Sequence, residues 1–164
     1  MKGLVVFYSR SGNTRKIAQE ISTALKFDLE EILDTKSRKG ILGFLSAGND
    51  AMQKRLTLLK EVKHDPSLYE LIVIGTPIWA GNISAPIRTY LNIHKKNFPQ
   101  VAFFYSGLSS DNSKVFKEME EICGKKPLSL LEVTSREIKR NIYYEKMKKF
   151  IDDLSKEMKK VNGN

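Results

Sequence analysis

The chain has 164 residues, 41% of them hydrophobic and 29% charged, a composition that supplies a folded core and excludes disordered and collagen-like chains. Its length fits one domain over residues 1–164, and its longest apolar runs fall short of the roughly 20 residues that a membrane-spanning helix needs, so we expect no transmembrane segment. One cysteine and two distant histidines argue against a disulfide, an iron–sulfur cluster or a metal site, while the net charge of +9 raises the question of an acidic partner.

The N-terminal residues predict a strand followed by a helix. Residues 2–8 are β-branched and aromatic, too short for a helix and followed by turn-forming residues, which is typical of a buried strand. This run has no small-residue cleavage site, so we expect no export signal and a cytoplasmic location. Apolar residues then recur at helical spacing from Ile17 to Leu25, and residues 27–33 alternate imperfectly, as in a short second strand.

The connection over residues 34–61 is long for a protein of alternating strands and helices. Its first part contains three glycines among apolar residues and predicts a mobile loop. Its second part predicts a crossover helix, because apolar residues recur at helical spacing at Ala51, Met52, Leu56 and Leu59. Phe44 and Leu45 in the loop either cover a ligand or pack against the sheet, and the sequence leaves both alternatives open.

The second half continues the alternation. The third strand, over residues 71–75, is apolar on both faces, which indicates helices on both sides of the sheet. The remaining expected elements are a helix after an N-cap at Ser84, a strand over 101–105, a helix capped by Asp111 or Asn112, a strand over 128–133 and one amphipathic helix over 136–164. Cys123 falls on a helix face and is expected to be a buried, inert residue.

This order of elements predicts an open parallel sheet covered by helices on both faces, in the flavodoxin-like or Rossmann-like α/β class. Ligands of such sheets bind beyond the carboxyl ends of the strands. The turns that follow Tyr8, Gly75 and Tyr105 are therefore the places to look for a site.

The first of these turns, Ser9-Arg10-Ser11-Gly12-Asn13-Thr14, is suited to a phosphate. It offers hydroxyls, an amide and a flexible glycine just before a helix N-terminus, where free N–H groups and the helix dipole favour an anion. It lacks the glycine spacing and the lysine of a triphosphate loop and the Gly-x-Gly-x-x-Gly of a dinucleotide site, so a single phosphate monoester fits best. Simple helix capping would account for only one or two of these polar residues.

These residues resemble the flavodoxin phosphate signature, Thr/Ser-x-Thr/Ser-Gly-Asn-Thr. The second turn, over residues 75–82, is similar to the flavodoxin loop that carries an aromatic against the flavin, and the third, over 106–111, more loosely resembles the loop at the isoalloxazine edge. The resemblance spans essentially the whole chain. It implies a three-layer α/β/α sandwich with a five-stranded parallel sheet in the order 2-1-3-4-5, noncovalent FMN and a redox function.

The resemblance also implies which residues contact FMN, and it implies no catalytic residue and no metal ligand. The phosphate would lie against Ser9, Ser11, Asn13 and Thr14, with close approach at the Gly12 backbone, and Arg10 is a further expected cofactor-binding residue. The ring and ribityl chain would contact Thr76, Pro77, Ile78, Trp79, Ala80, Gly81 and Asn82, and the pyrimidine edge Ser106, Gly107 and Leu108. Trp79, the sole tryptophan, either packs on the flavin or belongs to the core.

Two departures from electron-carrier flavodoxins shape the expected chemistry. The third turn has no aromatic residue between Ser106 and Asn112, which predicts an open outer flavin face. The three turns contain one acid, Asp111, and one base, Arg10, in a chain of net charge +9, whereas electron-carrier flavodoxins are generally acidic. Since carboxylates repel the anionic reduced flavin, their scarcity predicts a less negative second reduction potential.

The charge and the motifs leave a short series of possible functions. Most of the positive charge lies in residues 34–64 and 136–164, and no nucleic-acid motif accompanies it, so we expect no specific nucleic-acid binding, although acidic protein or membrane surfaces stay possible. The leading interpretation is an FMN-dependent electron carrier for a redox partner protein. The alternative is an NAD(P)H-dependent oxidoreductase that reduces quinones or other small acceptors. A flavin-free interaction module also stays open.

Two other functions built on related folds do not fit. A phosphorylation switch needs carboxylates after the first strand and an aspartate after the third, where this chain has Ser9 and Thr76. A low-molecular-weight phosphatase needs a thiolate in its phosphate loop, and Cys123 is far from that loop in the sequence.

Overall fold

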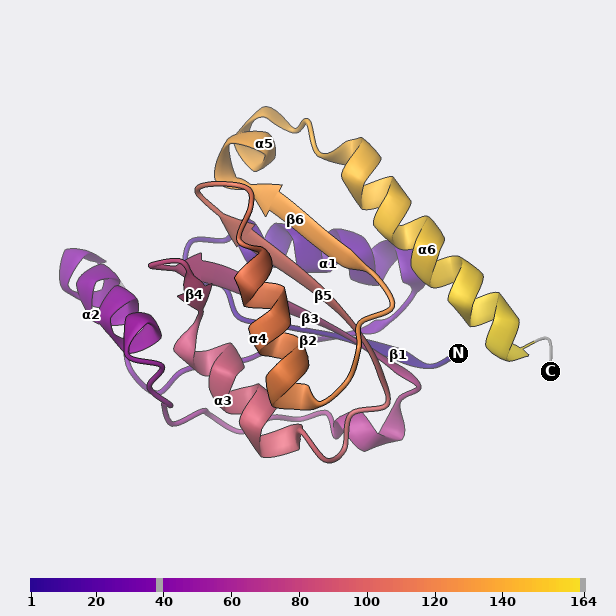
Figure 1. The fold of residues 1–164 in the computed structure, drawn as a ribbon, viewed down its shortest axis with the longest axis horizontal. Helices are drawn as coiled ribbons and strands as arrows, with labels where there is room; N and C mark the ends of the chain where they lie inside the picture. Colours follow the sequence, from indigo (N-terminus) through magenta and orange to yellow (C-terminus); the bar gives the residue numbers. More distant parts are fainter. Residues whose placement is uncertain (38–39, 163–164) are drawn as a thin grey trace.

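A computed structural model describes residues 1–37 and 40–162 and contains a parallel sheet between two layers of helices (Figure 1). The parallel strands, in the spatial order β2-β1-β3-β5-β6, are β2 (Asp28–Glu31), β1 (Gly3–Phe7), β3 (Leu71–Trp79), β5 (Gln100–Gly107) and β6 (Leu130–Thr134). A two-residue strand, β4 (Asn82–Ile83), pairs antiparallel with the end of β3. The five parallel strands, counted along the chain, have the predicted order 2-1-3-4-5, and the sheet and its class are confirmed; β4 is an addition.

The residues of β1 show how the two helical layers are built. Val5 and Phe7 face α1 (Asn13–Leu25) and α6 (Tyr144–Asn162), in a core that includes Ile17 and Phe150. Leu4 and Val6 belong to the opposite core, which also receives the helices α3 (Ala85–His94) and α4 (Ser113–Cys123). Because side chains alternate along a strand, the unbroken apolar run of β1 fills both cores. Cys123 is buried in the second of them, as expected.

The connection after β2 differs from its prediction. Residues Gly40–Met52 form a helix, α2, so the expected loop is helical, and Leu56 and Leu59, expected in a helix, follow it in an extended segment. The buried side of α2 carries small residues and one acid: Gly43, Ala47, Asp50 and Ala51. Of the three glycines that suggested a loop, only Gly43 is on the buried face, whereas a Cβ at Gly40 or Gly48 would meet nothing within 4 Å.

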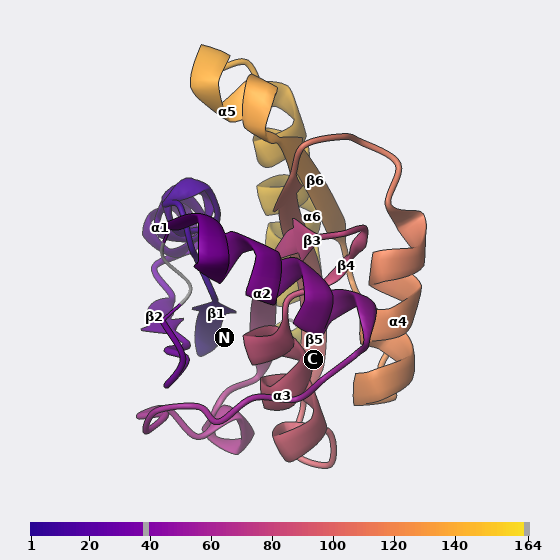
Figure 2. The same ribbon diagram turned by 90° about the vertical axis from the view of Figure 1, so that its left-hand side faces the viewer.

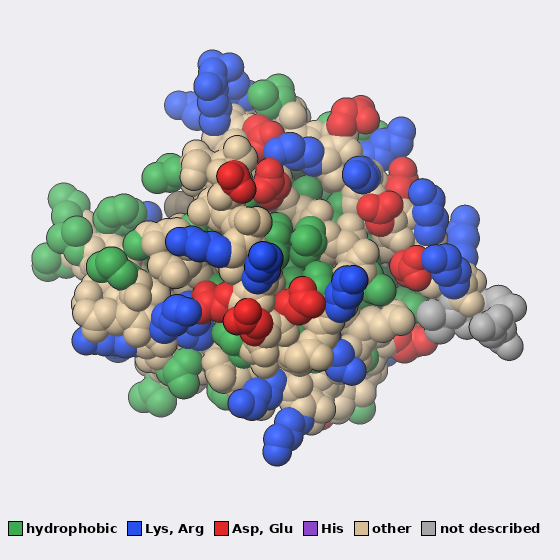
Figure 3. Space-filling view, in the orientation of Figure 1, with side chains coloured by type: hydrophobic (Ala, Val, Ile, Leu, Met, Phe, Trp, Pro, Cys, Tyr) green, Lys and Arg blue, Asp and Glu red, His purple; other side chains and the backbone are tan. Residues whose placement is uncertain are grey.

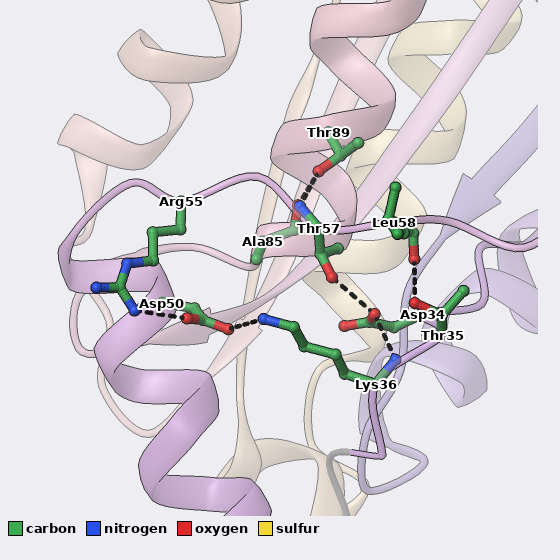
Figure 4. A network of polar contacts seen from close by, with 9 residues as sticks. All are labelled: Asp34, Thr35, Lys36, Asp50, Arg55, Thr57, Leu58, Ala85 and Thr89. Atoms are coloured by element: carbon green, nitrogen blue, oxygen red, sulfur yellow. Dashed lines mark hydrogen bonds and ion pairs between the residues drawn. The ribbon is translucent and has the colours of Figure 1, made fainter.

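This helix lies across the carboxyl-terminal edge of the sheet rather than on one of its faces (Figures 1 and 2). The polar contacts around it are drawn in Figure 4. Asp50 on the buried side pairs with Lys36 (3.7 Å) before the helix and with Arg55 (3.6 Å) after it. Residues on either side of α2 thus pair with one buried carboxylate near its C-terminal end.

The extended segment after α2 is fixed by hydrogen bonds. Thr57 donates its N–H to Thr89 Oγ1 of α3 (2.9 Å) and its hydroxyl to Asp34 Oδ1 (2.8 Å). Thr35 donates its hydroxyl to the carbonyl of Leu58 (3.0 Å). A short 3₁₀ turn, η1 (Pro66–Leu68), then leads into β3.

The C-terminal helix predicted over 136–164 is divided in two. The helix α5 (Ser135–Arg140) begins with a capping box formed by Thr134 and Glu137 and ends at Asn141, whose φ of 55° is left-handed. Tyr143 then turns inward and donates its hydroxyl to Glu20 of α1 (2.7 Å) before α6 starts. Nowhere in residues 1–37 and 40–162 is there a helix with the length and apolarity to cross a membrane.

Gly75 in β3 provides a test of the central packing. A Cβ at this position would overlap the ring of Phe104, which is fully buried on β5, whereas a Cβ at Gly48 of α2 would meet nothing within 4 Å. We expect Gly75→Ala to lower the free energy of unfolding by about 2 kcal/mol through overpacking. Gly48→Ala should raise it by up to about 1 kcal/mol through helix propensity. Urea unfolding of both variants measures this, and equal effects of the two substitutions would contradict the packing described.

Candidate functional site

The first turn places a helix N-terminus at the carboxyl end of β1. Gly12 has a φ of 98°, in the left-handed region that favours glycine, and a Cβ there would meet nothing within 4 Å. Its N–H donates to Ser9 Oγ (3.1 Å), and the first helical hydrogen bond runs from Lys16 N to the carbonyl of Gly12 (3.0 Å). The N–H groups of residues 13–15 come before that first bond and so have no acceptor within the helix. Such N–H groups bind anions at the N-termini of other helices.

Side chains of this turn are tied to the ends of two other strands. The Thr14 hydroxyl shares a buried hydrogen bond of 2.8 Å with the Ser106 hydroxyl at the end of β5. Asn13 donates its amide to Ser135 Oγ (3.2 Å) just after β6, and Ser135 donates in turn to the carbonyl of Gly107 (3.1 Å). These bonds fix the first and third turns relative to each other.

The second turn is a β-hairpin rather than an open loop. Ala80 and Gly81 both have positive φ, 47° and 70°, as in the two-residue type I′ turn that joins paired strands. Trp79 pairs with Asn82 across this hairpin. The Trp79 ring is 7% exposed and meets Tyr8 edge to face, with ring centroids 5.4 Å apart and planes at 89°. The hairpin thus fixes the indole at the end of the sheet.

Between these turns and α2 lies a cavity of about 570 Å³. Most of the predicted site residues line it: Arg10, Ser11, Asn13, Pro77, Ile78, Trp79, Ala80, Ser106, Gly107 and Leu108. The structure therefore brings together parts of all three turns around one space. Whether these residues bind a cofactor stays a prediction.

The other predicted residues lie outside the cavity lining and stabilise the turns. Ser9 and Thr14 make the hydrogen bonds described above, and Gly12 gives the first turn its shape. Thr76 is fully buried, with its hydroxyl 3.0 Å from Ser84 Oγ and accepting from Ser84 N (3.1 Å), so it fixes the start of α3. Gly81 and Asn82 form the hairpin, where Asn82 donates its amide to the carbonyl of Ala80 (2.7 Å).

Sequence reasoning missed most of the wall supplied by α2. Phe44 and Leu45, for which covering a ligand was one alternative, do line the cavity, together with Gly48, Asn49, Met52 and Ser135. Phe44 gives the cavity a second aromatic ring, from α2 rather than from the third turn. The Arg10 guanidinium lies over this ring, with its Cζ 5.0 Å from the ring centroid. The position of Ser135 directly after the last strand was a usable signal, because ligand sites gather at strand ends.

The electrostatics of the cavity are simple. Among the described residues that line it, Arg10 is the only charged one. Tyr105 at the end of β5 points away from the cavity: it is buried, donates to Glu132 (2.7 Å) and accepts from the N–H of Asn112 (3.2 Å). Burial and this carboxylate raise the pKa of Tyr105 to about 12, so it stays neutral and supports the third turn. The cavity wall therefore combines one positive charge with side chains that are otherwise uncharged, which suits a ligand with one anionic group.

Comparison with solved structures gives the class of the fold. A flavoprotein from Lactobacillus acidophilus NCFM, solved in complex with FMN, is 25% identical, with a TM-score of 0.68 over 85% of this chain and 97% of that one. Oxidised Flavodoxin 2 from Bacillus cereus is 19% identical, with a TM-score of 0.59 over 96% and 99% of the two chains. A WrbA-like flavodoxin from Agrobacterium tumefaciens is 12% identical, with a TM-score of 0.55 over 92% and 95%. The sequence matches no protein-family model and no curated protein.

The protein therefore has the flavodoxin-like fold, which confirms the resemblance to flavodoxins at the level of the fold. Its three turns occupy the carboxyl-terminal edge of the sheet, the position where ligands bind in this class of α/β fold.

The buried pair of hydroxyls provides a test of the site's internal bracing. We expect Thr14→Val and Ser106→Ala each to lower the free energy of unfolding by about 1–2 kcal/mol. Each substitution leaves the other hydroxyl of the pair buried without this hydrogen-bond partner. The double variant should cost less than the sum of the two, since it removes both partners. A thermodynamic cycle from urea unfolding measures the coupling, and strict additivity would show that the two hydroxyls do not interact.

Proposed function

We propose that this protein binds FMN noncovalently and works as an FMN-dependent redox protein. The observation that carries the proposal is the convergence on one cavity of a hydroxyl-rich turn at a helix N-terminus, the Trp79 hairpin and the end of β5. The FMN-bound flavoprotein with the same fold and 25% identity supports it.

The residues present fit this cofactor. The open, left-handed backbone at Gly12 leaves the N-terminus of α1 accessible to a phosphate, and Ser11 and Asn13 add polar side chains to the cavity there. Trp79, Ile78 and Leu108 offer apolar surface for a flat ring system. Bound FMN would supply the electron-transfer chemistry, and the chain would supply binding, orientation and electrostatics.

We propose an electron carrier as the first function, in which a redox partner protein exchanges electrons through the bound cofactor. The NAD(P)H-dependent oxidoreductase is a second candidate, favoured by the apolar side chains that Phe44, Leu45 and Met52 of α2 bring to the cavity, because these could receive a small apolar acceptor such as a quinone. Steady-state NAD(P)H oxidation by the FMN-loaded protein separates the two. Turnover with a quinone supports the enzyme, and no turnover with any acceptor supports the carrier.

The phosphate position can be tested with two ligands that differ only in the phosphate. We expect Ser11→Ala to weaken FMN binding about tenfold, the loss of one charge-assisted hydrogen bond, and to leave riboflavin binding nearly unchanged. The matched control is Ser109→Ala, an exposed serine of the third turn that is not among the cavity-lining residues. Titration calorimetry with both ligands measures this. Equal losses for FMN and riboflavin would place the phosphate elsewhere.

The charge of Arg10 provides a test of the redox electrostatics. Since Arg10 is the only charged residue among the described residues of the cavity wall, its removal takes from that wall the one positive charge that would stabilise an anionic reduced flavin. We expect Arg10→Gln to make the second reduction potential more negative, and Lys148→Gln, the same charge change on the exposed face of α6, to leave it almost unchanged. Spectroelectrochemical titration measures both. A potential that Arg10→Gln leaves unchanged would contradict this account.

A further inference from the structure

The N-terminal end of α2 carries large apolar side chains that the protein does not bury. Ile41 is 81% exposed and Leu42 83%, followed by Leu45 at 61% and Phe44 at 54%. In Figure 3 hydrophobic side chains gather on the projecting margin of the molecule where Figure 1 places α2. Exposed apolar side chains grouped in this way mark interaction surfaces more often than isolated ones do. We call Ile41, Leu42, Phe44 and Leu45 the α2 tip.

A ligand in the cavity would not account for the whole of the α2 tip. Phe44 and Leu45 line the cavity, so a cofactor or substrate there could cover part of them. Ile41 and Leu42 are not among the lining residues and are the two most exposed of the four. A ligand in the cavity would therefore leave these two side chains exposed.

The charge around α2 indicates the nature of that partner. Residues 35–60 contain six Lys or Arg residues and one acid, Asp50, and so contribute much of the net charge of +9 of the whole chain. Asp50 is 4% exposed and lies between Lys36 and Arg55, whose side chains are 56% and 54% exposed. One buried carboxylate thus offsets two exposed cations. Arg10, over the ring of Phe44, adds a further positive charge beside the tip.

We propose that the α2 tip docks onto an anionic lipid surface. Helices that bind at the surface of a bilayer insert large apolar side chains below the headgroups, while Lys and Arg side chains beside them pair with anionic lipids. Ile41 and Leu42 supply the apolar part and Arg10, over the Phe44 ring, the basic part beside it. Lys36 and Arg55, which pair with Asp50 near the other end of α2, add exposed positive charge farther along the helix. A projecting helix end with four large apolar side chains suits insertion between headgroups better than it suits the broad, flat contact of a standard protein interface.

The same helix joins this surface to the cavity. Its next turns place Gly48, Asn49 and Met52 in the cavity wall, so a membrane that receives the α2 tip would lie beside the cavity. If the proposed FMN function holds, an electron acceptor dissolved in the lipid would reach the cavity without crossing water. The docking proposal itself does not depend on FMN.

Vesicle binding of the whole protein, supplemented with FMN, tests the proposal. We expect co-sedimentation with vesicles of phosphatidylcholine and phosphatidylglycerol, weak association with phosphatidylcholine alone, and a loss of binding as salt is raised. The double variant Ile41→Ser/Leu42→Ser should bind the anionic vesicles at least about tenfold more weakly. The matched control, Leu68→Ser/Ile93→Ser, changes two other exposed side chains, 66% and 62% accessible, and should bind like the unaltered protein.

A second measurement separates loss of docking from loss of folding. Both double variants change exposed side chains, so their thermal unfolding should match that of the unaltered protein, as followed by circular dichroism. A polarity-sensitive dye attached to a Leu42→Cys variant should shift its emission to the blue with anionic vesicles, and Cys123 is buried against labelling.

Three results would overturn the proposal. These are failure of the unaltered protein to bind anionic vesicles, equal binding by Ile41→Ser/Leu42→Ser, and a concentration-dependent dimer that this variant abolishes, which would assign the α2 tip to a second copy of the chain. FMN content, read from absorbance, is recorded in every case, so a failure of the docking proposal can be distinguished from a failure of the proposed function.

Discussion

The structure depends on β3, which pairs in parallel with β1 on one side and with β5 on the other. Phe7 lies opposite Gly75, and Gly75 lies opposite Phe104, so the three strands are in register where β1 ends, and β3 and β5 continue beyond that level to Trp79 and Gly107. Gly75 makes this register possible, because any side chain there would displace the Phe104 ring. The turns that follow the strands therefore meet at one edge. The site is a consequence of this alignment, and hydrogen bonds such as that between Thr14 and Ser106 then hold the turns together.

At that edge the chain combines two kinds of wall. The turns supply polar groups and a helix N-terminus, whereas α2 supplies apolar side chains. Crossover helices usually cover a face of the sheet, but α2 lies at its edge. Asp50, near the C-terminal end of α2, pairs with Lys36 before the helix and with Arg55 after it, and the inner side of the helix carries the small residues Gly43, Ala47 and Ala51. A helix held at the edge in this way determines which molecules can approach the cavity, and it also carries the exposed α2 tip.

The sequence predicted the sheet and the three turns because their signals are local. Apolar runs such as 71–75 identify buried strands, and the polar residues of 9–14 stand directly before a helix. The sequence did not predict α2, since Gly40, Gly43 and Gly48 argue for a loop when their surroundings are unknown. It also missed the division of the last helix at Asn141, because the helical pattern of apolar residues continues across the break. Contacts between distant segments decide both cases.

The fixed position of Trp79 has a practical consequence. It is the only tryptophan of the chain, it lines the cavity, and the hairpin and Tyr8 restrict its movement. Nearly all the long-wavelength ultraviolet fluorescence of the protein must therefore come from one indole at the wall of the site. Occupancy of the cavity can be followed through the natural emission of the protein, without an attached label.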